Sequence, residues 1–254
     1  MERECRKKFP FDEVKLINRL FLIVFLISCL ETDGGKIYTR VISTRYGQIQ
    51  GFIRPFGQRQ LKPVEVYLGI PYATPPLGTN RFSPTRTPSP WSGVHTADKF
   101  SPPCPQKFPD IRNGSLESLA MERVILMKHY IPLLTNHSED CLYLNIYAPL
   151  QDTSSETIKT HPVLVIIHGG SYSWNSGNMY DGGVLASYSN TVVITLNYRL
   201  GVLGFLNANK NPTRSARVAN YGLMDQIAAL HWIQQNIAPF GGDPENVTLL
   251  GHGT

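Results

Sequence analysis

The chain has 254 residues, of which 42% are hydrophobic and 17% are charged, so it contains enough apolar material for a sizeable core and is not a disordered or low-complexity chain. Residues 1–30 hold 6 of the 24 basic and 4 of the 19 acidic residues, leaving 18 basic and 15 acidic residues elsewhere. This small, dispersed charge argues against nucleic-acid binding. The four cysteines include no Cys-x-x-Cys spacing, so we expect no metal site and no cofactor.

A basic segment followed by a short apolar one opens the chain. Six cations between Arg3 and Arg19 precede the apolar residues 20–30. This order is typical of a secretory signal. About 11 apolar residues fall short of the roughly 20 that cross a bilayer, so a type II membrane anchor is the weaker alternative. We predict a signal peptide over residues 1–30 and an extracellular domain over 31–254.

Cysteines and sequons agree with a secretory route. Once the signal is removed, Cys104 and Cys141 are the two remaining cysteines, and an oxidising compartment would join them in one disulfide. Two buried free thiols are the alternative. Three N-glycosylation sequons begin at Asn113, Asn136 and Asn246.

The first half of the domain combines strands with irregular segments. Residues 41–52 alternate apolar and polar side chains, and residues 64–70 form a short apolar run, so both predict strands. Residues 71–91 are rich in Pro, Thr and Ser and predict an irregular surface segment. Between the two cysteines, residues 116–130 predict one helix within a large loop.

The second half predicts alternating strands and helices. Short runs of Val, Ile and Leu indicate a sheet covered on both faces, and they occupy residues 142–147, 163–167, 192–196 and 247–250. Residues 220–238 predict an amphipathic helix whose apolar face comprises Leu223, Ile227, Leu230, Ile233 and Ile237, with Asp225 and Gln226 on other faces. We predict an α/β domain with a mostly parallel central sheet and helices on both faces.

A glycine-rich turn follows one of these strands. His168, Gly169, Gly170 and Ser171 come directly after residues 163–167, where α/β sheets place their sites. Backbone N–H groups in such a turn can stabilise an oxyanion. A tight turn that needs positive φ explains the glycines equally well, so both interpretations remain open.

The last 15 residues resemble the type-B carboxylesterase and cholinesterase family. In that family, Phe-Gly-Gly is followed by four residues, an apolar strand and the nucleophile elbow Gly-x-Ser-x-Gly. In this chain, Phe240-Gly241-Gly242 is followed by a predicted strand and then by Gly251, His252, Gly253 and Thr254. Residues 138–145 are similar to the family's second signature, whose cysteine, here Cys141, belongs to a conserved disulfide. Further matches lie at residues 81–82, 91–93, 197–201 and 220–226. The resemblance implies the α/β-hydrolase fold, of which this chain would be the amino-terminal half.

The same resemblance argues against catalysis. The nucleophile position is Gly253, which supplies no oxygen or sulfur for an acyl-enzyme. Active members have His-Gly-Gly-Gly, and Ser171 replaces the third glycine. His252 is expected to point away from the cleft, and rescue by Thr254 or Ser171 is disfavoured. We therefore predict that the protein is not an enzyme.

His-Gly-Gly-Ser-Tyr together with Gly253 resembles the neuroligins, the non-catalytic branch. This resemblance implies a catalytically inactive, cholinesterase-like adhesion receptor of the plasma membrane, postsynaptic and binding a neurexin-type presynaptic receptor. It also implies a homodimer, calcium held at the partner interface by ligands outside this chain, and a membrane anchor in a carboxyl-terminal part. The alternatives are a secreted or membrane carboxylesterase hydrolysing small esters, or another non-catalytic esterase-like junction or guidance protein.

We interpret the chain as an amino-terminal fragment. In this family the triad acid and histidine follow the elbow in chain order, so Asp140 and His231 are not expected to be catalytic. Asp140 is instead expected to pair with a buried arginine such as Arg199, and His231 to lie on a packing helix. The strand at 247–250 would then keep an uncovered edge.

Overall fold

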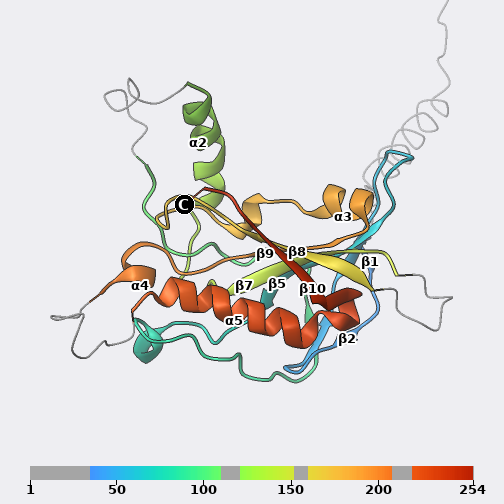
Figure 1. Ribbon diagram of the computed structural model, residues 1–254, viewed down its shortest axis with the longest axis horizontal. Helices are drawn as coiled ribbons and strands as arrows, with labels where there is room; N and C mark the ends of the chain where they lie inside the picture. The colour runs from blue at the N-terminus through green and yellow to red at the C-terminus, as the bar shows by residue number, and fades with distance from the viewer. Residues whose placement is uncertain (1–34, 110–120, 152–159, 208–218, 254) are drawn as a thin grey trace, which may run out of the picture. The chain divides into compact units, whose positions relative to one another are not determined.

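The computed structural model of the chain describes residues 35–109, 121–151, 160–207 and 219–253 (Figure 1). The chain divides into two compact units, Met1–Lys36 and Ile37–Thr254, and the architecture that follows is that of the second unit. The predicted signal peptide and the sequon at Asn113 lie outside the described residues.

Seven strands form a mixed sheet in the order β1-β4-β5-β7-β9-β8-β10. In chain order they are β1 (Ile37–Tyr38), β4 (Phe52–Arg54), β5 (Val64–Pro71), β7 (Tyr143–Pro149), β8 (His161–Ile167), β9 (Val192–Leu196) and β10 (Gly242–Gly251). A smaller sheet joins β2 (Ile42–Ser43), β3 (Gln48–Gln50) and β6 (Val94–Thr96). The single strand predicted over residues 41–52 is therefore broken, because the backbone turns at Gly47, whose carbonyl accepts a 3.0 Å bond from the N–H of Thr44.

The α/β-hydrolase type of sheet is confirmed, but its strands are not mostly parallel. In the seven-stranded sheet, only the pairs β8–β9 and β8–β10 are parallel among the described neighbours. The pairs β1–β4, β4–β5, β5–β7 and β7–β9 are antiparallel. Apolar runs reveal that a sheet is covered on both faces, and an antiparallel strand between two helix layers has the same composition as a parallel one.

Helices cover both faces, as predicted (Figure 1). In the described residues the α-helices are α2 (Met121–Leu134), α3 (Gly183–Ser189), α4 (Gly201–Phe205) and α5 (Tyr221–Asn236), and the short 3₁₀ turns are η1 (Gly78–Asn80), η3 (Gly177–Met179) and η4 (Ala238–Phe240). Figure 1 shows α5 along one side of the sheet and α3 on the other. The predicted helix at 116–130 corresponds to α2, which extends four residues further.

Alternation along the strands creates two cores. On β9, Val192 and Ile194 belong to the cluster that contains Trp232 of α5, whereas Val193 belongs to the cluster that contains Ala186 of α3. Successive side chains of a strand point to opposite faces, so one apolar strand fills both layers.

The buried face of α5 differs from the predicted one. Leu223 is 39% exposed and Ile227 is 53% exposed, whereas Asp225 is completely buried. Apolar spacing alone predicted that Asp225 lies on an exposed face of α5. Its carboxylate instead pairs with the buried Arg199, so in the first half of α5 the side that carries Asp225 faces the core. Ile233 and Ile237 are buried as predicted.

The crossover connections diverge at β8. The chain passes from β8 through α3 on one face to β9, and then through α5 on the other face back to β10, which pairs with β8. The carboxyl ends of β8 and β10 therefore flank a topological switch point, where open α/β sheets form a crevice. The glycine-rich turn and the elbow follow these two strands.

Candidate functional site at the ends of β8 and β10

The turn after β8 is a run of left-handed residues. Gly170 has φ +106°, Ser171 +55° and Tyr172 +56°. The Gly170 carbonyl accepts a 3.0 Å hydrogen bond from the N–H of Ser173, and the Tyr172 carbonyl accepts one of 2.7 Å from the N–H of Gly201. Ser171 thus occupies backbone geometry that favours glycine, and the turn is tight whether or not it ever holds an oxyanion.

The elbow lies against this turn because β10 and β8 are parallel and in register. Gly251 is opposite Ile167, so the residues that follow each strand meet. A β-carbon built on Gly169 would overlap the carbonyl oxygens of His252 and Gly253. The two sequence motifs singled out for catalysis are therefore in contact, and only glycine fits at position 169.

Gly253 keeps a backbone that a nucleophile could use. Its φ is +63°, and no heavy atom lies within 4 Å of the position of a β-carbon. Strained, open backbone is what an exposed nucleophile at an elbow requires. The feature missing at this position is the side chain, and Thr254 lies outside the described residues.

His252 faces Tyr180. Its Nδ1 atom lies 3.3 Å from the Tyr180 hydroxyl, and Tyr180 packs against the core cluster beneath α3. The imidazole is exposed to solvent and has a phenol as its neighbour in place of a nucleophile. Among the described residues, the hydrogen-bond neighbour of His252 is thus the Tyr180 hydroxyl, which lies outside the elbow.

His168 anchors the turn in the neutral state. Burial lowers the pKa of its imidazole to about 4, and the hydrogen bond between Nδ1 and the Gly169 carbonyl, 3.0 Å long, opposes this shift. The ring stacks on Tyr198 at 4.4 Å, and the Tyr198 hydroxyl donates a 2.7 Å hydrogen bond to the His168 carbonyl. A neutral, stacked imidazole with a low pKa holds backbone in place and is a poor general base near pH 7.

Gln106 links the turn to the disulfide, and nothing in the sequence pattern singled it out. Its Nε2 donates to the carbonyls of Cys104 (3.0 Å) and Asn175 (3.2 Å), and its Oε1 accepts from the N–H of Asn175 at 2.7 Å. Cys104 and Cys141 form a disulfide with an S–S distance of 2.03 Å. The base of the 104–141 loop is thereby tied to the segment that follows Ser171.

An open pocket of about 640 Å³ lies beside this turn. It is lined by residues 105–109, by the turn around Ser171 and Trp174, and by the start of α4 at Leu200 to Leu203. This size is within the range of small-molecule sites. Its described lining contains Ser171, Ser173 and Lys107 but no histidine or carboxylate side chain, so it lacks the imidazole and the acid of a serine triad.

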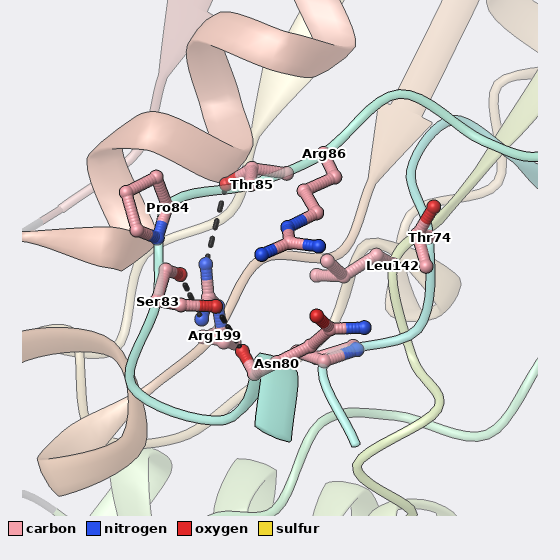
Figure 2. A pocket seen from close by; sticks show the side chains of 9 residues that line it. Thr74, Asn80, Ser83, Pro84, Thr85, Arg86, Leu142 and Arg199 are labelled. Carbon is pink, nitrogen blue, oxygen red and sulfur yellow. Dashed lines mark hydrogen bonds between the residues drawn. The ribbon is translucent and has the colours of Figure 1, made fainter. Parts of the chain in front are cut away.

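The buried arginine does not pair with Asp140. Arg199 binds Asp225 through Nε–Oδ2 and Nη2–Oδ1 contacts of 2.8 Å each, and Asp140 accepts a 2.8 Å bond from the Tyr143 hydroxyl instead. Figure 2 shows Arg199 directed at Ser83 and Thr85, to which its guanidinium donates hydrogen bonds of 3.0 and 3.2 Å. These three residues line a pocket of about 10 Å³, which has room for a single water. The expected Asp140–Arg199 pair was wrong because the spacing in sequence does not reveal which carboxylate is nearest to Arg199 in space.

The remaining site predictions fall at the surface or outside the described residues. Asn136 follows α2 and Asn246 lies in β10, and both side chains are exposed. Within the described ranges, no group of three or more His, Cys, Asp or Glu side chains is arranged to hold a metal ion. None of the helices in these ranges is both long and apolar enough to cross a membrane.

Comparison with known proteins identifies the family. The model of the carboxylesterase family matches residues 38–254. The chain belongs to the carboxylesterase family. Among solved structures of this family's fold, a thermophilic pNB esterase is similar with a TM-score of 0.63 and 38% identity, covering 84% of this chain and 38% of the esterase. A Geobacillus stearothermophilus carboxylesterase has a TM-score of 0.63 and 37% identity, over 84% of this chain and 38% of its own.

Curated relatives come from both branches of the carboxylesterase family. Mouse neuroligin-2 is 42% identical over 231 residues, which cover 84% of this chain and 27% of the relative. Mouse neuroligin-3 is 43% identical over 232 residues, with the same coverage. Mouse carboxylesterase 1E is 41% identical over 222 residues, covering 87% of this chain and 34% of the relative. The chain thus spans 27% to 34% of the length of these relatives, and identity alone does not separate the branches.

Proposed function

We propose that the protein is a catalytically silent, cholinesterase-like adhesion receptor. The observation that carries this proposal is the glycine at position 253, the place of the nucleophile in the elbow. Acyl transfer in this family needs a side-chain oxygen that a base can deprotonate, and glycine has none. Similarity to neuroligin-2 and neuroligin-3 supports the adhesion role.

The turn that faces the elbow supports the same conclusion. Ser171 stands where active members have the third glycine, and its left-handed φ of +55° is strained for a residue with a side chain. His252 and His168 are each engaged elsewhere, with Tyr180 and Gly169 respectively. Departures from the catalytic motif at both halves of one centre, Gly253 and Ser171, favour disuse over a single chance change.

The finer parts of the proposal rest on the neuroligin resemblance. The protein would enter the secretory pathway and present this domain outside the plasma membrane at the postsynaptic side. It would bind a neurexin-type receptor through calcium and would act as a homodimer. The calcium ligands, the dimer contacts and the membrane anchor would lie in parts of the protein outside residues 1–254.

Esterase activity is the second candidate, and one observation favours it. Gly253 retains the left-handed φ of +63° and open space around its β-carbon position, so the elbow backbone is competent. Similarity to carboxylesterase 1E is nearly as high as to the neuroligins. A third candidate, a non-catalytic junction or guidance protein, shares the missing serine and differs only in its partner.

Hydrolysis of a short-chain aryl ester by the full-length protein tests the catalytic question. We expect no organophosphate-sensitive hydrolysis, because position 253 has no serine that the organophosphate could phosphorylate. Gly253→Ser in the same protein is the matched variant, since the backbone there accepts a β-carbon without displacement. Organophosphate-sensitive turnover by the unmodified protein would exclude the silent receptor.

Binding to immobilised neurexin tests the partner. We expect binding in calcium that is lost in a chelator. Absence of binding in both conditions, together with absence of hydrolysis, would favour the junction or guidance protein over a neuroligin-like receptor.

A further inference from the structure

Asn136 lies at the base of the loop that the disulfide closes. Cys104 and Cys141 are both buried and bonded to each other. Between α2 and Cys141, the chain turns through Asn136, whose side chain is exposed. The sequon Asn136-His137-Ser138 therefore ends three residues before a half-cystine.

The third residue of this sequon is held by the folded base of the loop. The N–H of Ser138 donates a 3.0 Å hydrogen bond to the carbonyl of Pro103, which directly precedes Cys104. The hydroxyl of Ser138 accepts a 3.1 Å bond from the N–H of Asp140. The N–H and the hydroxyl oxygen of Ser138 are thus both hydrogen-bonded, and the partner of its N–H comes from the segment that carries the other cysteine.

Formation of the disulfide also sets the position of Ser138 relative to Pro103. Bonding Cys104 to Cys141 brings Pro103 beside Ser138, because each of these residues is within three positions of a half-cystine. N-glycosylation needs an accessible acceptor segment whose hydroxyl residue can engage the transferase. The side chains of Asn136 and His137 remain exposed after closure, whereas Ser138 is half-buried, with its N–H and its hydroxyl oxygen both hydrogen-bonded to the folded base of the loop.

We propose that Asn136 is a conditional N-glycan acceptor, modified before the Cys104–Cys141 bond closes and refractory afterwards. The proposal rests on the secretory route that the proposed function assumes. In its other described ranges the chain offers Asn246 as a contrasting sequon, since it lies in β10, outside the disulfide loop. Oxidation timing, and not sequence alone, would then set how much of the protein carries sugar at Asn136.

Both covalent steps are balanced by named reactants. In glycosylation, Nδ2 of Asn136 forms a bond to the anomeric carbon of a lipid-linked oligosaccharide, the bond from that carbon to oxygen breaks, lipid pyrophosphate leaves with the electron pair, and an amide proton is lost to the transferase. In closure, the two thiols lose two electrons and two protons, and a disulfide of the oxidising machinery is reduced to a dithiol.

Site-specific occupancy in the full-length protein from a secretory cell line tests the proposal. Peptides are deglycosylated in heavy-oxygen water, and the labelled fraction of each asparagine is measured by mass spectrometry. The wild type is compared with Cys104→Ala/Cys141→Ala, which leaves no thiol in the loop. We expect a several-fold rise at Asn136 in the variant and little change at Asn246. Ser138→Ala, which destroys the sequon, should abolish the signal at Asn136.

A second experiment uses only wild-type protein, so it tests the proposal even if the cysteine variant does not fold. Wild-type protein is synthesised with a membrane-permeant thiol reductant, which is then washed out so that the disulfide forms late. Secreted, oxidised protein should carry more glycan at Asn136 than untreated protein. Equal occupancy in wild type, variant and treated protein would overturn the proposal, and so would a parallel rise at every sequon, which indicates general unfolding. Absence of sugar at all three sequons would instead refute the secretory route on which the proposed function also depends.

Discussion

At the scale of single residues, Gly169 is the tightest point of the candidate site. We expect Gly169→Ala to lower the free energy of unfolding of the full-length protein by about 1–3 kcal/mol, because the added methyl overlaps two backbone carbonyls that cannot rotate away. The matched control is Gly251→Ala, where no atom lies within 4 Å of the new carbon. Thermal or denaturant unfolding of both variants checks this prediction, and equal stability of the two would contradict it.

His168 should make stability depend on pH. Burial holds its pKa at about 4, against 6.5 ordinarily, so between these values the unfolded chain binds a proton that the folded chain does not. The free energy of unfolding should therefore fall as pH drops from about 6.5 to 4, by up to about 3 kcal/mol. Urea titrations at several pH values should show a shallower dependence for His168→Asn. His231→Asn, at an exposed position on α5, is the control and should keep the wild-type slope.

At the scale of elements, the Arg199–Asp225 pair joins the segment after β9 to α5. Its side chains are 4% and 0% exposed, whereas those of Arg54 and Asp181, which also form a bidentate pair, are 30% and 61% exposed. Asp225→Asn leaves a buried guanidinium uncompensated and should cost about 3–5 kcal/mol. Asp181→Asn breaks a solvated pair and should cost about 0–1 kcal/mol. Denaturant unfolding of the two variants side by side would contradict this account if their losses were similar.

The same pair explains the one helix whose face was assigned incorrectly. Periodicity located α5 to within two residues at each end, because apolar spacing is a local property of the sequence. It could not reveal that Asp225 would be buried, since that requires Arg199 to arrive from another element. Similarly, α3 and α4 were not predicted: they are seven and five residues long, too short for a periodic pattern to be recognised.

At the scale of the whole molecule, β10 leaves an uncovered edge within the described residues. It pairs with β8 on one side only, and Leu249 and Leu250 are 51% and 46% exposed. Unpaired, apolar strand edges promote association between chains. We expect the 254-residue chain, prepared alone, to self-associate, and we expect Leu249→Lys to reduce the apparent mass seen by light scattering. A monodisperse, cooperatively melting wild-type chain would contradict this prediction.

The sequence by itself determined the fold class and the positions of those strands of the main sheet that are apolar runs. It also determined the two glycine motifs at the carboxyl ends of β8 and β10. Each of these depends on neighbouring residues: alternation along a strand, turn chemistry, and the absence of a side chain at Gly253. Tertiary structure alone decided the strand directions, the partner of Arg199, the buried side of α5 and the contact of Gly169 with the elbow. These features join segments far apart in the chain, and whether such segments meet depends on the packing of the whole sheet and its helices, which local spacing does not encode.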